Sequence, residues 1–489
     1  MFLPKHNKLI VLLTCVLLVL SCKDKNSLPT GPDETDDVNK SITILYTNDE
    51  HGWMEPTSTH GGAAGMVGLW KGKEGYSENG PFLILSGGDM WTGPAISTWT
   101  KGEAMIAAMN AMGYNAAALG NHEFDNKIEG LKERMDQAEF PFLSANTREK
   151  QSGLSPDFAL PYVVQTINGI KVGLIGLTTT TTPTSTFPDH VIDYNFIPYD
   201  QALQEVIPNV KADSAELMII VGHITCNEMR RLAPLAAQLG VSVIGGGHSH
   251  EVVNENVSGV AIIESGCNLQ NYAKVEIVFD TDADTIVSLV QSIEQNTGGT
   301  PDAEVEAIVT FWQNQVKATL SEVIGYVNEE IGQRSNAMYN MVTDSWLYVY
   351  PSADISTTNT GGIRQSIPAG NITLGTIVGL LPFENNIIEL ELTGNQVIDC
   401  THYLIVGGMT KLDGYKLADG TPLDANAMYS VLTTDYLYAR DDYNFSSYDT
   451  SPYYTSIHYR QPVIDWIKSL MNTSSSNPLD LYLDFTPRQ

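Results

Sequence analysis

Short apolar segments rich in β-branched residues recur along the first half of the chain, and most of them end in a polar cluster. Segments of this length, bounded by glycine and polar residues, predict buried β-strands. The expected strands are at residues 41–47, 82–85, 115–119, 171–177, 216–221 and 241–244. Helical spacing of apolar residues lies at 103–112 and 126–137, and this alternation of strand and helix predicts an α/β fold.

All but one of these strands end in clusters of glycine, asparagine, aspartate or histidine. Because loops at one edge of a sheet converge in space, we expect the clusters to form a single site. The candidate metal ligands are Asp49, His51, Asp89, Asn121, His223, His248 and His250. Nitrogen and oxygen donors without cysteine suit a catalytic pair of divalent ions, whereas structural zinc prefers a closed, cysteine-rich site. Asp89 follows two glycines that allow a tight turn, so its carboxylate is the candidate bridge between two ions.

The segment at residues 120–125 adds the candidate catalytic groups. His122 can point away from Asn121, toward a substrate, and Asp125 lies three residues further on to fix the tautomer of the imidazole. Each cluster taken alone is also typical of an ordinary polar turn or a helix N-cap. The recurrence of such clusters after successive strands favours the metal site.

The length and charge of the chain narrow the possible functions. A chain of 489 residues is too long for one hydrophobic core and predicts two domains. Acidic residues outnumber basic ones, 57 to 27, and the formal net charge is −30. Such a surface repels nucleic acids and anionic lipid headgroups, so we expect neither as a partner. An anionic substrate would need a local positive field from metal ions or from a few well-placed arginines.

The N-terminus has the features of an export signal. Residues 1–21 combine a basic start with an apolar core too short to span a membrane in the mature protein. Residues 19–22 resemble a bacterial lipobox, which implies cleavage before Cys22 and attachment of lipid to it. A signal cleaved elsewhere and an uncleaved anchor are the alternatives. Residues 22–40 are polar and acidic, as in a flexible tether, and the sequence leaves open whether the lipid lies on the periplasmic side or the cell surface.

The second half of the chain has a different pattern. A catalytic domain is expected at residues 41–298, where a glycine-rich break ends it. Helical spacing at residues 302–324 makes residues 299–330 a helical connector, and residues 331–489 form a second domain. The aromatic run at residues 436–445 is typical of a half-buried strand and turn.

A series of motifs makes the sequence similar to a known family. The motifs lie at residues 46–52, 88–89, 120–125, 222–223 and 247–250. Their order, spacing and residue types resemble the motif series of calcineurin-like metallophosphoesterases and, among these, of the bacterial and animal 5′-nucleotidases. The match covers about residues 41–285, and residues 331–489 resemble the C-terminal nucleotide-binding domain of that family.

The resemblance implies a four-layer α/β/β/α metallophosphoesterase domain, a smaller α+β domain, and two divalent ions of zinc, manganese, iron or cobalt. It implies a first ion held by Asp49, His51, Asp89 and His250, and a second held by Asp89, Asn121, His223 and His248. His122 and Asp125 would form the catalytic dyad. The implied substrate contacts are Arg334, Asn359 and Arg364 to phosphate or ribose, Phe383 and Tyr436 to the two faces of a base, and Asp442 to the sugar hydroxyls.

One loop departs from the family pattern. Where the family usually has Gly-Gly-Asp-Gly, this chain has Arg440, Asp441, Asp442 and Tyr443. The loss of three glycines changes how closely the backbone can approach a ligand, so the base preference is left open.

We therefore expect an exported, lipid-anchored enzyme that hydrolyses nucleoside 5′-monophosphates with two metal ions. The same site suits cyclic nucleotide diesters and nucleotide-sugar pyrophosphates. Hydrolysis of a sulfur ester on a carrier protein is a weaker hypothesis, because Arg334, Phe383 and Tyr436 argue for a nucleotide. A non-catalytic binding lipoprotein is disfavoured by the intact ligand set. The sequence does not fix the oligomeric state.

Overall fold

The computed structural model describes residues 38–470 and 474–489. The predicted export signal and the predicted lipid-attachment residue, Cys22, lie outside the described residues. The first strand, β1, begins at Asn39, slightly before its expected start. Within the described ranges, no helix combines the length and the apolar character needed to cross a membrane.

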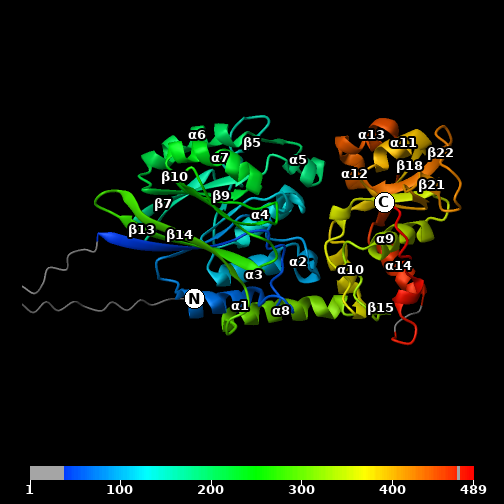
Figure 1. The fold of residues 1–489 in the computed structure, drawn as a ribbon, viewed down its shortest axis with the longest axis horizontal. Helices are drawn as coiled ribbons and strands as arrows, with labels where there is room; N and C mark the ends of the chain where they lie inside the picture. Colours follow the sequence, from blue (N-terminus) through cyan, green and yellow to red (C-terminus); the bar gives the residue numbers. More distant parts are fainter. Residues whose placement is uncertain (1–37, 471–473) are drawn as a thin grey trace, which may run out of the picture. The chain divides into compact units, whose positions relative to one another are not determined.

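Two six-stranded sheets form the centre of the N-terminal half (Figure 1). The first sheet has the order β14 (Thr285–Gln295), β13 (Asn271–Asp280), β1 (Asn39–Thr47), β2 (Phe82–Ser86), β3 (Ala116–Ala118) and β4 (Phe142–Leu143). The second has the order β11 (Val252–Val257), β12 (Val260–Ser265), β10 (Val241–Gly245), β9 (Leu217–His223), β7 (Ile170–Thr178) and β6 (Tyr162–Ile167). Strands β1 to β4 are parallel, as are β12, β10, β9 and β7, so their carboxyl ends gather at one edge of each sheet.

Both faces of these parallel strands are buried, which explains why they are continuous apolar runs in the sequence. In β1, Ile44 packs between the two sheets and the next residue, Leu45, packs against a helix layer. In β9, Ile219 packs between the sheets and Ile220 faces the opposite helix layer. Successive side chains alternate between faces, so a strand covered on both sides needs an apolar residue at every position.

Helices cover the outer faces of both sheets and complete four layers (Figure 1). The first sheet is covered by α1 (Gly62–Leu69), α3 (Glu103–Met112), α4 (Lys127–Gln137) and α8 (Ala303–Leu320). The second is covered by α6 (Tyr199–Ala212) and α7 (Cys226–Leu239). The shorter elements are α2 (Ala95–Trp99), α5 (Thr182–Ser185) and the paired strands β5 (Thr147–Glu149) and β8 (Tyr194–Phe196). The expected α/β/β/α arrangement is confirmed.

The C-terminal half is a smaller α+β domain, as expected. Its sheet has the order β19 (Ile405–Gly407), β16 (Ile355–Thr358), β22 (Met428–Thr434), β18 (Asn386–Thr393) and β23 (Tyr453–His458). One core packs α9 (Asn336–Val349), α10 (Leu374–Leu380) and α14 (Gln461–Ser469) against it. A second core contains residues of α11 (Gly394–Thr401), α12 (Asp435–Ala439) and α13 (Phe445–Tyr448). The remaining strands are β15 (Val323–Val327), β17 (Gly370–Thr373), β20 (Met409–Thr410) and β21 (Lys416–Leu417).

The connector helix ends earlier than the sequence pattern predicts. Helix α8 begins after Asp302, whose side chain accepts the first backbone N–H groups, and it ends at Leu320. Val323 and Ile324 continue the apolar spacing, but they lie in β15, which pairs with β17. The helical pattern extends only two apolar residues beyond Leu320, and pairing of these residues with a distant strand overrides it.

The prediction of a strand and turn at residues 436–445 was wrong. The segment contains most of α12, a single helical turn at Asp441–Tyr443, and the start of α13. The hydroxyl of Thr434 accepts the N–H of Leu437 and caps α12. This local capping favours helix over strand, although tyrosine and phenylalanine are typical strand residues.

Candidate metal centre and substrate cavity

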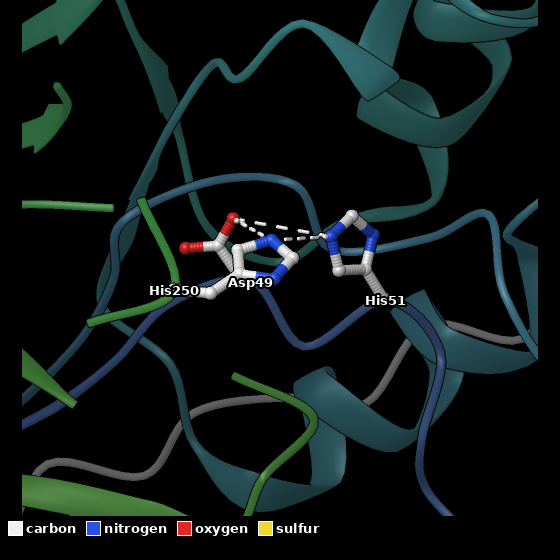
Figure 2. A group of neighbouring side chains, drawn as sticks. All are labelled: Asp49, His51 and His250. Atoms are coloured by element: carbon white, nitrogen blue, oxygen red, sulfur yellow. Dashed lines mark hydrogen bonds and ion pairs between the residues drawn. The ribbon is translucent and has the colours of Figure 1, made fainter. Parts of the chain in front are cut away.

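The predicted ligands come from the carboxyl ends of β1, β2, β3, β9 and β10, and therefore from two sheets rather than from one sheet edge. Most of them form compact groups in which the ligand atoms lie within 4.8 Å of one another. These groups are Asp49, His51 and His250 (Figure 2), then His51, Asp89 and His122, and finally Asp89, His223 and His248. Asp89 belongs to two groups, so its carboxylate reaches both sets of histidines.

Asn121, the seventh predicted ligand, lines the same cavity as Asp89, His248 and His250. Its amide nitrogen donates to the carbonyl of Ser185 at 3.1 Å. Its Oδ1 is buried and accepts no hydrogen bond from any described residue. A buried polar oxygen without a partner costs about 1–3 kcal/mol. A divalent ion would satisfy this oxygen, so the donor set fits a metal pair.

The backbone at most of these ligands is in the left-handed region. The φ angles are 50° at Asp49, 45° at His51, 58° at Asp89, 72° at His248 and 57° at His250. This region costs a non-glycine residue about 1–3 kcal/mol and persists only where the surroundings hold it. These five ligand side chains therefore reach the candidate metal centre from a strained backbone, and such strain is typical of a functional site.

Glu123, which the sequence-based prediction did not include, holds two of the ligand loops together. Its carboxylate accepts the backbone N–H groups of Asp89, Met90 and Gly120 at 2.8, 2.9 and 2.7 Å. The side chain is fully buried, and burial raises its pKa to about 8. The sequence signal for this role was a glutamate inside the motif at residues 120–125, directly after a predicted strand.

We expect Glu123→Gln to lower the free energy of unfolding by about 2 kcal/mol, because an amide nitrogen would face backbone N–H donors. Chemical denaturation of the metal-free protein measures this change. Glu129→Gln, at an exposed glutamate of α4, is the matched control. A stability equal to that of the control would show that these hydrogen bonds contribute nothing.

Two further glutamates support the other loops. Glu264, near the end of β12, accepts the hydroxyl of Ser249 at 2.8 Å. Ser249 lies between His248 and His250 in the chain. Glu50 accepts the hydroxyls of Thr47 and Ser86, which end β1 and β2. Burial raises the pKa of Glu264 to about 8 and the pKa of Glu50 to about 7.

The electrostatics of the centre suit cations. Burial alone would raise the pKa of Asp49, but His223 and His250 outweigh it and lower this pKa to about 2. Burial likewise opposes the charge on His250, yet its contact with Asp49 (Nε2 to Oδ1, 3.2 Å) raises its pKa to about 10. Because metal ligands bind in the deprotonated form, uptake of ions would release such protons.

The two predicted catalytic residues are in contact. His122 Nδ1 lies 2.8 Å from Asp125 Oδ2, and the other carboxylate oxygen accepts the Thr186 hydroxyl at 3.2 Å. The backbone N–H of His122 donates to Asp89 Oδ1 at 2.8 Å. Its ring stacks on Phe383 with centroids 5.6 Å apart. Since Asp125 engages Nδ1, Nε2 is the nitrogen left to face a ligand.

A cavity of about 650 Å³, called the main cavity below, opens beside these residues. His122 and Asp125 line it, as do four of the predicted substrate contacts, namely Asn359, Arg364, Phe383 and Tyr436. Arg364 Nη2 donates to His51 Nε2 at 3.0 Å, and its guanidinium lies 5.9 Å from the centre of the Phe383 ring. Residues of both domains therefore meet at this cavity.

Asp442 does not line the main cavity. Its exposed carboxylate pairs with Arg440 through two bonds, Nε to Oδ1 at 2.9 Å and Nη2 to Oδ2 at 2.5 Å. Arg440 lines the cavity instead and donates from Nη1 to the Tyr436 hydroxyl at 2.7 Å. Its guanidinium also lies 5.1 Å from the Tyr443 ring. The prediction did not include Arg440, although the unusual loop sequence pointed to this position.

Arg334 also lies away from the main cavity. It lines a second cavity of about 370 Å³ together with His51, His250 and Arg364. The cavities share His250, Gly361 and Arg364, so they meet at the candidate metal ligands.

Comparisons with known proteins agree with this architecture. The model of the calcineurin-like phosphoesterases matches residues 42–252, and that of the 5′-nucleotidase C-terminal domain matches residues 318–400. The silent protein UshA(0) of Salmonella typhimurium is 30% identical over 438 residues, which cover 76% of this chain and 78% of that protein. The cell wall protein Lmo0130 of Listeria monocytogenes is 24% identical over 85% of this chain, which spans 65% of its length.

Among solved structures, the 5′-nucleotidase precursor from Thermus thermophilus has a similar fold, with a TM-score of 0.79 and 23% identity. The superposition covers 92% of this chain and 99% of that one. The chain belongs to the calcineurin-like phosphoesterases, which are metal-dependent phosphoester hydrolases, and within them to the 5′-nucleotidase family.

Proposed function

We propose that the protein hydrolyses nucleoside 5′-monophosphates to nucleoside and phosphate with two divalent ions. The strongest support is the position of Asp89. Its carboxylate belongs to two groups of candidate metal ligands, and the residue lines the main cavity. One ion would be held by Asp49, His51, Asp89 and His250, and the other by Asp89, Asn121, His223 and His248. When bound, such ions lower the pKa of a water molecule and polarise phosphoryl oxygens. Zinc, manganese, iron and cobalt all accept these ligands.

His122 is the proposed proton donor to the leaving oxygen. Water adds to phosphorus and gives one proton to solvent, and the bond from phosphorus to the nucleoside 5′-oxygen breaks. That oxygen takes a proton from His122 Nε2, and solvent then restores the proton of the imidazole. Asp125 holds Nδ1 at 2.8 Å, which fixes the tautomer and stabilises the charged ring. The stacked Phe383 ring limits rotation of the imidazole.

The C-terminal domain would hold the nucleotide. Arg364 and Asn359 are the proposed contacts to phosphate and ribose. Arg364 now donates to His51 Nε2, and an ion bound at that nitrogen would displace this hydrogen bond and free the guanidinium. Phe383 and Tyr436 are the proposed platforms for the base. For Asp442 to bind sugar hydroxyls, its ion pair with Arg440 would have to open.

The proposed location is the bacterial envelope, with lipid attached at Cys22. The sequence features of residues 1–22 support export, and a relative described as a cell wall protein is consistent with it. The family model of a 5′-nucleotidase C-terminal domain supports a nucleotide as the substrate.

Metal-dependent phosphate release from a substrate panel tests the function. We expect AMP to be hydrolysed faster than UDP-glucose and 2′,3′-cyclic AMP, chelation to abolish release, and added zinc, manganese or cobalt to restore it. Faster cleavage of the cyclic diester or the nucleotide sugar would reassign the substrate. No metal-dependent release from any of the three would reject the proposed activity.

The base platforms give a separate prediction. Tyr436→Ala combined with Phe383→Ala should raise KM for AMP by about ten- to hundredfold, because each stacked base contributes about 1–3 kcal/mol. Tyr436→Ala alone should leave kcat nearly unchanged, since only Phe383 packs on His122. Steady-state kinetics measures both constants, and Tyr453→Ala, at an exposed tyrosine of β23, is the control. An unchanged KM in the double variant would mean that these rings only pack the protein.

A further inference from the structure

Arg440 gives the wall of the main cavity a hydrogen-bonding group that the usual family pattern does not have. It stands where that pattern has the first glycine of Gly-Gly-Asp-Gly, and it lines the main cavity beside Tyr436. A glycine has no side chain with which to contact a ligand. Any contact between this guanidinium and a substrate is therefore an addition to the family's usual set of contacts.

The guanidinium of Arg440 is held in place from several sides. Nε and Nη2 donate to the two carboxylate oxygens of Asp442, and Nη1 donates to the Tyr436 hydroxyl at 2.7 Å. That hydroxyl in turn donates to the carbonyl of Thr184 at 3.3 Å. The Tyr443 ring lies 5.1 Å from the guanidinium, and the arginine side chain is 16% exposed. A group fixed in this way loses little freedom when it binds a ligand.

Two of its N–H groups remain available. A guanidinium has five N–H donors, and described residues accept from three of those of Arg440, one each on Nε, Nη1 and Nη2. One donor is therefore left on each terminal nitrogen. The bond to the hydroxyl places the guanidinium at the rim of the Tyr436 ring, 5.5 Å from its centre. A base stacked on this ring would bring its edge to the same rim.

The charge around Arg440 decides which kind of group it suits. Asp442 compensates its positive charge, and a second phosphate at this place would meet the Asp442 carboxylate as well. The free donors therefore suit two neutral acceptors that lie side by side. Guanine and hypoxanthine present such a pair, O6 and N7, which is the usual partner of arginine on a base edge. Adenine has an amino group in place of O6, and no pyrimidine has an N7.

We propose that Arg440 makes the site selective for 6-oxopurine nucleotides, GMP and IMP, by donating hydrogen bonds to O6 and N7 of the base. This inference rests on the proposed function, and it keeps the ion pair between Arg440 and Asp442 closed. With AMP, the amino group of the base would face an N–H donor of Arg440. Both groups would then lack an acceptor inside the cavity, which disfavours the complex.

Substrate competition tests this selectivity. We expect kcat/KM for GMP and for IMP to exceed that for AMP about tenfold, the factor that corresponds to one unsatisfied polar contact. In Arg440→Met, which keeps an unbranched side chain beside the two tyrosine rings, the three values should become nearly equal. Lys101→Met is the matched control, because it removes another cation from the wall of the main cavity and should leave the selectivity intact.

A substrate analogue probes the contact without any substitution in the protein. In 7-deaza-GMP a C–H group replaces N7, while O6 and the rest of the nucleotide are kept. The unchanged protein should hydrolyse it with a kcat/KM about tenfold below that for GMP, and Arg440→Met should treat the two nucleotides alike. Equal kcat/KM values for GMP and 7-deaza-GMP in the unchanged protein would overturn the proposed contact.

Binding of nucleosides gives a measurement that does not depend on catalysis. Guanosine should raise the melting temperature of the metal-free protein more than adenosine does, and this difference should disappear in Arg440→Met but not in Lys101→Met. A selectivity for GMP that survives in Arg440→Met would assign it to other residues. Faster hydrolysis of guanosine 3′,5′-bisphosphate than of GMP, lost in Arg440→Met, would make this arginine a phosphate contact. Either result overturns the proposal.

The two proposals can fail separately. If the unchanged protein releases no phosphate from GMP, IMP or AMP, the nucleotidase proposal fails, while the melting-temperature comparison still tests recognition of the base. If all three nucleotides are hydrolysed with equal kcat/KM, only the role of Arg440 in selectivity fails.

Discussion

Replacing His122 with asparagine is expected to lower kcat for AMP by about 10²–10⁴-fold, the usual contribution of a positioned general acid. Asparagine can occupy similar space but cannot transfer a proton at neutral pH. The contact of the imidazole Nδ1 with Asp125 is lost, while the backbone N–H that donates to Asp89 remains. We therefore expect kcat to fall while the metal content per chain, measured by elemental analysis, stays at the value of the unchanged protein.

The metal measurement separates two roles for His122. Its ring atoms lie within 4.8 Å of the ligand atoms of His51 and Asp89, so geometry alone would also permit it to bind an ion. Loss of metal along with activity would make it a ligand, and near-normal turnover would remove it from the mechanism. His402→Asn is the control, because it makes the same substitution at an exposed histidine, and it should leave kcat and metal content unchanged.

The candidate metal centre could be proposed from the sequence because its proposed ligands follow local signals. Asp49, Asp89 and His223 each lie at or just after the end of an apolar strand, and that pattern is visible without any knowledge of the fold. The sequence pattern does not say which strands share a sheet. The bond from the Tyr46 hydroxyl to the Gly246 carbonyl, at 3.0 Å, links the two sheets across 200 residues.

The proposed substrate contacts follow less directly from the sequence, since their positions depend on the partners with which the side chains pair. Asp442 pairs with Arg440 two residues away, and only Arg440 lines the main cavity. Arg334 makes no hydrogen bond or ion pair with any residue that the structure describes, and it lines the second cavity. A motif identifies a residue in the sequence. It does not say which partner or cavity a long charged side chain reaches in the folded protein.

The supporting glutamates illustrate a different limit. Glu50, Glu123 and Glu264 are all fully buried, whereas glutamate is usually exposed unless it is paired. Besides near neighbours, their partners include backbone N–H groups and hydroxyls on loops that are remote in sequence. A buried carboxylate among backbone donors holds strained loops in place, and such partners become visible only when the loops have been brought together.

Asp89→Asn is the substitution with the largest expected effect on the metal centre. The retained Oδ1 of asparagine can still accept the N–H of His122 at 2.8 Å, so the loop should keep its fold. The other position becomes a neutral NH₂ group near His223 Nε2, where the carboxylate oxygen now lies at 3.1 Å. A neutral amide with one oxygen cannot bridge two cations. We expect fewer than two ions per chain and a fall in kcat of at least about 10³-fold.

Metal-induced stabilisation makes this test independent of catalysis. Zinc or manganese should raise the melting temperature of the unchanged protein, because ions bind the folded state, and should raise it far less in Asp89→Asn. Asp442→Asn is the matched control, since its carboxylate is exposed and paired only with Arg440. If Asp89→Asn still took up two ions with the same thermal shift, the carboxylate could not be their bridge. Each ion would then have its own ligands, and the proposal of a shared centre at the meeting point of the two sheets would fail.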